Sequence, residues 1–166
     1  MKYRRLTYEE LEERTSQFIQ FLTKQTIDMS QWAELQQTNT TLARQLIDDF
    51  SDIVIEQKLN EINFLEQRTN KELKVYKLLK TKIIIINLQV QTEANLDLCR
   101  YASVANLLSG FDHSMWDFIQ LDVAEHKYNS ERAQEIFQLM KTGCFITHET
   151  EFNALYDLSK SRRVAA

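Results

Sequence analysis

The stretch that decides the fold is Lys82-Ile83-Ile84-Ile85-Ile86-Asn87-Leu88-Gln89-Val90, near the middle of a chain of 166 residues. Four successive isoleucines are stable in an extended strand only where both faces of that strand are at least partly covered. One face is fully apolar and consists of Ile84, Ile86, Leu88 and Val90, whereas the opposite face becomes polar at Asn87 and Gln89. The stretch therefore predicts a central strand with helices packed on both faces.

A second run with a period of two precedes this strand. In the predicted hairpin, Leu73-Lys74-Val75-Tyr76-Lys77-Leu78-Leu79 pairs with it through a turn at residues 80–82. Lysines at positions 74 and 77 are typical of an exposed edge strand, where they prevent edge-to-edge aggregation. A third strand is predicted at about Trp116 to Ala124, joined by a helix over Asn95–Ser109 in a right-handed crossover.

Helical periodicity accounts for most of the remaining chain. Predicted helix starts lie at the capping box Thr7-Tyr8-Glu9-Glu10, at Asp28, at Thr40 or Thr41, at Asn129 or Ser130, and at Thr147. The prediction is an α+β fold, with a small mixed sheet of about three strands, one hairpin plus one crossover strand, flanked by five to six helices. We expect residues 1–160 to form a single globular domain and residues 161–166 to be a frayed C-terminal tail.

Glycine and cysteine usage limits the classes of function. The chain has two glycines and no proline, and Gly110 and Gly143 each follow a helical run, where a left-handed residue ends a helix. Glycine-rich phosphate loops are therefore excluded. Cys99 and Cys144 form no Cys-x-x-Cys pair, and no apolar run reaches the ~20 residues of a membrane span. We expect a reduced, cytoplasmic protein that is not in the membrane.

The net charge of −4 conceals a basic segment. Residues 71–90 hold 5 basic and 1 acidic side chains, whereas residues 1–70 hold 8 and 12 and residues 91–166 hold 7 and 11. A basic hairpin with a tyrosine could bind RNA or a ribonucleoprotein, through phosphate contacts and base stacking. The residues of this alternative are Arg4, Arg5, Lys74, Tyr76, Lys77, Lys80 and Lys82.

One short motif suggests an enzyme. Glu125-His126-Lys127 has the Glu-x-Lys spacing of metal-dependent nucleases, but the neighbouring strand offers only Asn87 where such sites need a second acid. The three histidines show no metal-ligand spacing with one another or with cysteine. We therefore assign no catalytic, cofactor-binding or metal-binding residue and expect no cofactor, and a metal-dependent hydrolase is the weakest alternative.

Several segments together resemble a family of small, uncharacterised bacterial proteins. These segments are Met1-Lys2-Tyr3-Arg4-Arg5-Leu6-Thr7, Glu9-Glu10-Leu11, Phe50-Ser51-Asp52, Tyr128-Asn129-Ser130-Glu131-Arg132, Glu135-Ile136-Phe137 and Gly143. The resemblance covers most of the chain. It implies a cytoplasmic bacterial domain and transfers no activity, substrate or catalytic residue.

The remaining features favour a non-enzymatic role. Ample helix and apolar material, without glycine loops or metal spacing, favours a protein-interaction domain that binds a protein partner or a second copy of itself. Tryptophan is enriched in binding hot spots. Trp32 and Trp116 are therefore the candidate partner-binding residues.

Overall fold

The computed structural model describes the backbone of residues 1–165 and the side chains of residues 1–161. Its internal contacts divide the chain into two compact units, Met1–Leu59 and Asn60–Ala166. A single domain over residues 1–160 stays a prediction. The predicted tail, residues 161–166, ends at Ala166, which lies outside the described residues.

The α+β class is confirmed, but the predicted mixed sheet of about three strands and the predicted five to six helices are wrong. Residues 1–165 form seven α-helices and one five-stranded antiparallel sheet, with two short 3₁₀ helices. The helices are α1 (Tyr8–Glu12), α2 (Thr15–Lys24), α3 (Met29–Thr38), α4 (Thr40–Glu61), η1 (Leu98–Arg100), α5 (Val104–Ser109), η2 (Met115–Phe118), α6 (Arg132–Lys141) and α7 (Glu149–Ala165). The strands are β1 (Phe64–Arg68), β2 (Glu72–Leu78), β3 (Lys82–Val90), β4 (Ile119–Lys127) and β5 (Phe145–Ile146).

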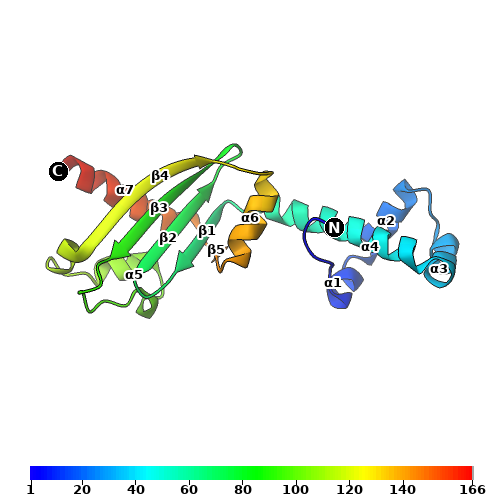
Figure 1. Cartoon of the computed structure of the whole chain (residues 1–166), viewed down its shortest axis with the longest axis horizontal. Coiled ribbons are helices and arrows are strands. Elements are labelled where there is room, and N and C mark those ends of the chain that lie inside the picture. Colours follow the sequence, from blue (N-terminus) through cyan, green and yellow to red (C-terminus); the bar gives the residue numbers. More distant parts are fainter. Residues whose placement is uncertain (166) are drawn as a thin grey trace. The chain divides into compact units, whose positions relative to one another are not determined.

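The strand order is β4-β3-β2-β1-β5 (Figure 1). The predicted hairpin is confirmed as β2 and β3, with Leu78 opposite Ile83. The prediction that the first hairpin strand is an edge is wrong, because β1 pairs along β2 on its other side. The predicted right-handed crossover is also wrong, since β4 runs antiparallel to β3 and the handedness rule concerns parallel strands.

The core of the second unit lies on the face of the sheet that carries the even-numbered side chains of β3. Ile86 and Leu88 are fully buried there against Phe152 and Leu155 of α7. Helix α6 lies over the opposite face, where its Leu139 lines a cavity together with Ile83 and Tyr76. Figure 1 shows α7 passing behind the sheet and α6 beside the end of the sheet that is nearest the β2–β3 turn. Both faces of β3 are thus partly covered, as the four isoleucines predict.

Local signals set several helix ends. Thr7 forms the predicted capping box with Glu10, and Asp28 forms a second one with Gln31. The predicted helix over Asn95–Ser109 is largely absent, because only η1 and α5 are helical there, and Ser103 caps α5 through the Asn106 N–H.

The two glycines differ in conformation. Gly143 has φ +99°, the left-handed conformation predicted after a helix. Gly110 has φ −82°, so the same prediction is wrong for it. A Cβ at Gly110 would lie 2.7 Å from Cε1 of Tyr101, and glycine is needed at this position because the tyrosine ring packs so closely.

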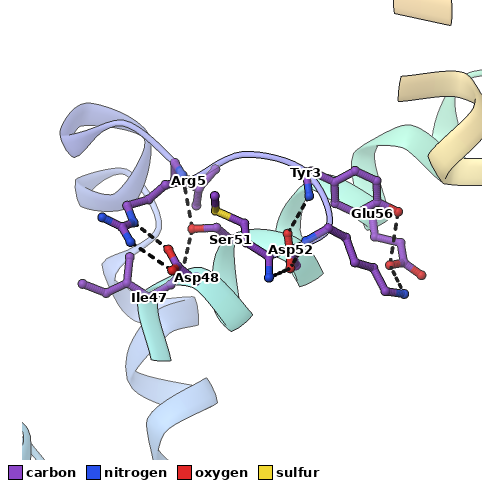
Figure 2. Close-up of polar contacts among 10 residues, drawn as sticks. Tyr3, Arg5, Ile47, Asp48, Ser51, Asp52 and Glu56 are labelled. Carbon is purple, nitrogen blue, oxygen red and sulfur yellow. Dashed lines mark hydrogen bonds and ion pairs between the residues drawn. The ribbon is translucent and has the colours of Figure 1, made fainter. Parts of the chain in front are cut away.

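The first residues of the chain lie along α4 and are held by its acidic side chains (Figure 2). The Asp52 carboxylate accepts hydrogen bonds from the backbone N–H groups of Lys2, at 2.6 Å, and Tyr3, at 3.0 Å. The Leu6 N–H donates to Oγ of Ser51 at 3.1 Å. We call residues 1–6 in this position the N-terminal strap.

Two side chains of the strap add contacts to the same helix. The Arg5 guanidinium donates two hydrogen bonds to Asp48, at 2.6 and 2.9 Å, and holds the pKa of that carboxyl below its usual value. The Tyr3 hydroxyl donates to Glu56 at 3.3 Å. Tyr3 and Leu6 are themselves buried, so the strap is part of the core of the first unit.

Arg132 holds the β2–β3 hairpin in the second unit. Its guanidinium donates to four backbone carbonyl oxygens, and the hydroxyl of Tyr128 donates to one of these at 2.7 Å. A planar group with five donors suits this task, whereas a lysine does not. The four acceptors are the carbonyl groups of Asn60, Ile62, Leu78 and Leu79.

We predict that Asp52→Ala lowers the stability of the first unit by about 1–2 kcal/mol, because two backbone donors of the strap lose their acceptor. Urea unfolding followed by Trp32 fluorescence, in a Trp116→Phe background, measures this unit specifically. Asp49→Ala is the matched control, since Asp49 lies on the same helix and is exposed. Equal unfolding midpoints for the two variants would contradict the proposed role of the strap.

Candidate interaction site at the β1–β5 edge of the sheet

A cavity of about 450 Å³ lies beside β1 and β5 in the second unit. Its walls come from four segments that are far apart in the sequence: β1, the residues around η1, β5 with the residues after it, and α7. Its lining residues are Glu66, Arg68, Cys99, Tyr101, Ala102, Phe145, Ile146, Thr147, His148 and Glu151. We call this space the Glu66 cavity.

A buried ion pair forms the floor of the Glu66 cavity. Glu66 is 2% exposed, and its Oε1 accepts from Nε and Nη2 of Arg68 at 2.7 and 2.5 Å. The hydroxyl of Thr147 lies 3.4 Å from the other carboxylate oxygen. Arg68 also donates through Nη1 to the Tyr101 carbonyl at 2.6 Å. The pair therefore ties β1 to the loop after η1 and to the segment after β5.

Burial dominates the electrostatics of this pair. Burial raises the pKa of Glu66 above its usual value, and the nearby Glu151 raises it further, whereas Arg68 and Thr147 lower it. The carboxyl of Glu151 is itself engaged, because its Oε2 accepts from the Val104 N–H at 2.6 Å. Both carboxylates thus have structural partners, which suits a preformed binding cavity better than a general base.

The rim of the Glu66 cavity is apolar and exposed. Phe145 and Ile146 form β5, and their exposed fractions are 49% and 56%. Leu65 is opposite Ile146 and Glu66 opposite Phe145, and the Thr147 N–H donates to the Phe64 carbonyl. Because bonded pairs alternate in an antiparallel ladder, the backbone N–H and C=O of Ile146 face away from β1.

The two tryptophans lie elsewhere. Trp32 is 7% exposed, and its ring packs edge-on against Phe18 with 5.1 Å between centroids. Trp116 is half-buried and packs edge-on against Phe111 at 5.0 Å. Both rings contribute to packing, and their partner-binding role stays a prediction. The signal that sequence reasoning missed is Phe145-Ile146, a pair with high strand propensity directly after the helix-ending Gly143.

The lysines of the RNA alternative are not gathered on one face of the sheet. Lys77 and Lys82 share the face of Ile84, Lys74 lies on the opposite face, and Lys80 is in the turn. Tyr76 is 5% exposed and cannot stack on a base without rearrangement. Most of the cations have acidic partners: Arg4 with Glu10, Arg5 with Asp48, Lys74 with Glu72, Lys77 with Glu149, and Lys82 with Glu125.

Glu125 of the nuclease-like motif and Asn87 of the neighbouring strand lie on opposite faces of the sheet. Glu125 is opposite Ile84, so it lies on the face away from Asn87, which is opposite Asp122. The Glu125 carboxylate accepts from Lys82 at 2.7 Å. Among the residues that the structure describes, no three His, Cys, Asp or Glu side chains gather as a metal ion would need.

The fold and the cavity define an α+β protein with an antiparallel sheet and a preformed, partly apolar surface site. The chain belongs to the Family of unknown function (DUF6495), whose model matches residues 1–160. The predicted membership of an uncharacterised family is thus confirmed, and its bacterial origin stays a prediction. No curated protein and no solved structure matches the chain. Within the described part of the chain, no helix is long and apolar enough to span a membrane.

The segments that predicted the family have structural roles. The opening segment and Phe50-Ser51-Asp52 meet in the strap, and Tyr128 and Arg132 hold the hairpin. None of the residues in these segments lines the Glu66 cavity, although Phe145 and Ile146, which do line it, follow shortly after Gly143. A family pattern of this kind therefore indicates how the chain folds, and its functional surface has to be found by geometry.

We predict that Glu66→Leu lowers the free energy of unfolding by about 3 kcal/mol, since the buried Arg68 guanidinium loses its carboxylate. Glu66→Gln should cost less, because the amide oxygen still accepts a hydrogen bond. The control is Glu125→Gln, which breaks an exposed pair with Lys82 and should cost about 1 kcal/mol or less. Urea unfolding followed by Trp116 fluorescence measures all three, and a similar cost for Glu66→Leu and Glu125→Gln would contradict the prediction.

The raised pKa of Glu66 also predicts a pH dependence. The folded state holds this proton more strongly than the unfolded state, so the contribution of Glu66 to stability falls as pH rises through its folded pKa. Between about pH 4, the usual carboxyl range, and pH 7, the wild type should lose stability relative to Glu66→Gln. Urea midpoints measured in half-unit steps test this, and parallel curves for the two proteins would exclude it.

Proposed function

We propose that this protein is a non-enzymatic interaction domain that binds a protein partner at β5 and the Glu66 cavity. The observation that supports this function most directly is the pair Phe145 and Ile146, about half exposed on an edge strand at the mouth of a cavity. Exposed apolar side chains that adjoin a cavity are typical of binding surfaces. Aromatic residues are also enriched in protein interfaces.

The geometry of β5 offers a partner two kinds of contact. Phe145 and Ile146 point to opposite faces of the sheet because side chains alternate along a strand. The outward N–H and C=O of Ile146 can pair with an extended segment of the partner, as in recognition by strand addition. A partner segment with apolar side chains at alternate positions fits this edge best.

The Glu66–Arg68 pair supports binding by keeping the cavity in shape. It connects β1, the Tyr101 loop and Thr147 in the absence of a partner. A surface that is ordered before binding loses less conformational entropy when the partner arrives. This is the physical reason to place a buried ion pair under an otherwise apolar rim.

We also propose that the protein acts in the cytoplasm. Cys99 is an exposed free thiol and Cys144 a buried one, and free thiols fit a reducing compartment. Burial raises the pKa of Cys144, so its thiol stays protonated and unreactive. The Cys144 thiol also forms a hydrogen bond with the Tyr76 hydroxyl.

The test is photo-crosslinking in the cells that make the protein. A photoreactive phenylalanine analogue placed at Phe145 should capture one discrete protein partner, identified by mass spectrometry. The matched control is the same analogue at Phe118, which is 38% exposed at the other edge of the sheet. We predict that the partner adduct forms from position 145 and not from position 118.

Substitutions then test the energetics. Phe145→Ser with Ile146→Ser should weaken binding of the purified partner at least tenfold, because each removed apolar side chain contributes about 1–2 kcal/mol. Ile53→Ser, which changes a side chain of similar exposure in the first unit, should leave the affinity unchanged. Equal affinities for the double variant and the wild type would overturn the proposed site.

A further inference from the structure

The other edge of the sheet is long and regular. Strand β4 pairs with β3 over nine successive positions, from Ile119 opposite Val90 to Lys127 opposite Lys82, without a bulge. Figure 1 shows it as the outermost strand. Natural edge strands are commonly protected by shortness, bulges, proline or charged side chains. This strand is long, regular and free of proline, and a strand that pairs with its outer side has to match its charged side chains Asp122, Glu125 and Lys127.

The register determines which backbone groups face outward. The Gln91 N–H donates to the Phe118 carbonyl, so the even-numbered residues of β4 form the bonded pairs with β3. The N–H and C=O groups of Leu121, Val123, Glu125 and Lys127 therefore face away from β3. Within the described part of the chain, these backbone groups have no hydrogen-bond partner.

We propose that β4 pairs in antiparallel fashion with β4 of a second copy of this chain. A two-fold axis at Ala124 brings the outward groups into register, with Val123 opposite Glu125 of the second copy and Leu121 opposite Lys127. Between them, Asp122 lies opposite His126 of the second copy. The two sheets then form one continuous antiparallel sheet, and each edge satisfies the other's unpaired groups.

Charge and size favour this register over one with the two-fold axis at Glu125. Asp122 and His126 form two symmetric contacts in which a ring N–H donates to a carboxylate. Ala124 meets Ala124 of the second copy on the axis, where a non-bonded pair brings Cα atoms within about 4.5 Å. A two-fold axis at Glu125 would instead place the two Glu125 carboxylates opposite each other, and like charges directly opposite are destabilising.

The Glu125 charge at this edge is already compensated. Glu125 forms an ion pair with Lys82 at 2.7 Å, so it enters the interface with its counter-ion. Leu121 and Val123 are half-buried in the single copy, and a second strand would cover them further. The interface lies at the opposite edge from β5, so it leaves the proposed partner site open.

A proline substitution tests the pairing without disturbing the fold. The N–H of Glu125 faces outward and donates nothing to β3, so Glu125→Pro removes an interface donor and adds a steric block. Glu125→Thr is the matched control. Both Glu125→Pro and Glu125→Thr lose the ion pair with Lys82, so the comparison between them isolates the backbone effect. In sedimentation experiments the wild type and Glu125→Thr should form dimers, and Glu125→Pro should raise the dimer dissociation constant at least tenfold. A wild type that stays monomeric at about 100 μM, or equal constants for the two variants, would overturn the proposal.

The register has its own test, which does not depend on how well the proline variant folds. In a Cys99→Ser background, Ala124→Cys should form a disulfide-linked dimer on mild oxidation, because the two-fold axis places the two sulfur atoms within bonding reach. Gln120→Cys, which is exposed on the same face of β4, should stay monomeric. Equal crosslinking at both positions would exclude the axis at Ala124. Crosslinking at Phe145 in the monomeric variant separately reports the partner site.

Discussion

Burial of the even-numbered side chains of β3 is the constraint on which the second unit depends. Ile86 and Leu88 have no exposed surface, and each full burial of such a side chain contributes about 1.5–3 kcal/mol. The residues opposite Ile86 and Leu88 on β2 and β4 are also apolar. A shift of the pairing by one residue would turn Ile86 and Leu88 to the other face of the sheet, so their burial fixes the register. The register of β2, β3 and β4 and the position of α7 follow from this burial.

Polar groups hold what the apolar core does not reach. Asp52 and Ser51 accept hydrogen bonds from backbone N–H groups of the strap. Arg132 donates hydrogen bonds to the carbonyl groups of Ile62 and of Leu78 in the hairpin. Glu66 and Arg68 do the same for the loop at Tyr101. In each case a charged side chain serves backbone groups of a distant segment, so it is a structural residue although its charge resembles that of a functional one.

The candidate site could be predicted only in part. Sequence reasoning predicted partner binding at Trp32 and Trp116. In the structure these rings pack against Phe18 and Phe111, and their partner-binding role stays a prediction. It gave the lysines of β2 an edge-protecting role, which the pairing of β1 with β2 removes. Phe145 and Ile146 become conspicuous only when their exposure is known, because a two-residue strand has no periodicity to detect.

The sequence by itself determined the features that depend on near neighbours. These are the α+β class, the capping boxes of Thr7 and Asp28, the β2–β3 hairpin and the apolar face of β3, each set by contacts within a few residues. Only the tertiary structure decided the strand order, the pairing of β1 and β5, and the burial of Glu66. These depend on residues far apart in the sequence, such as Glu66 and Thr147, which are 81 positions apart, and local propensity carries no information about such pairs.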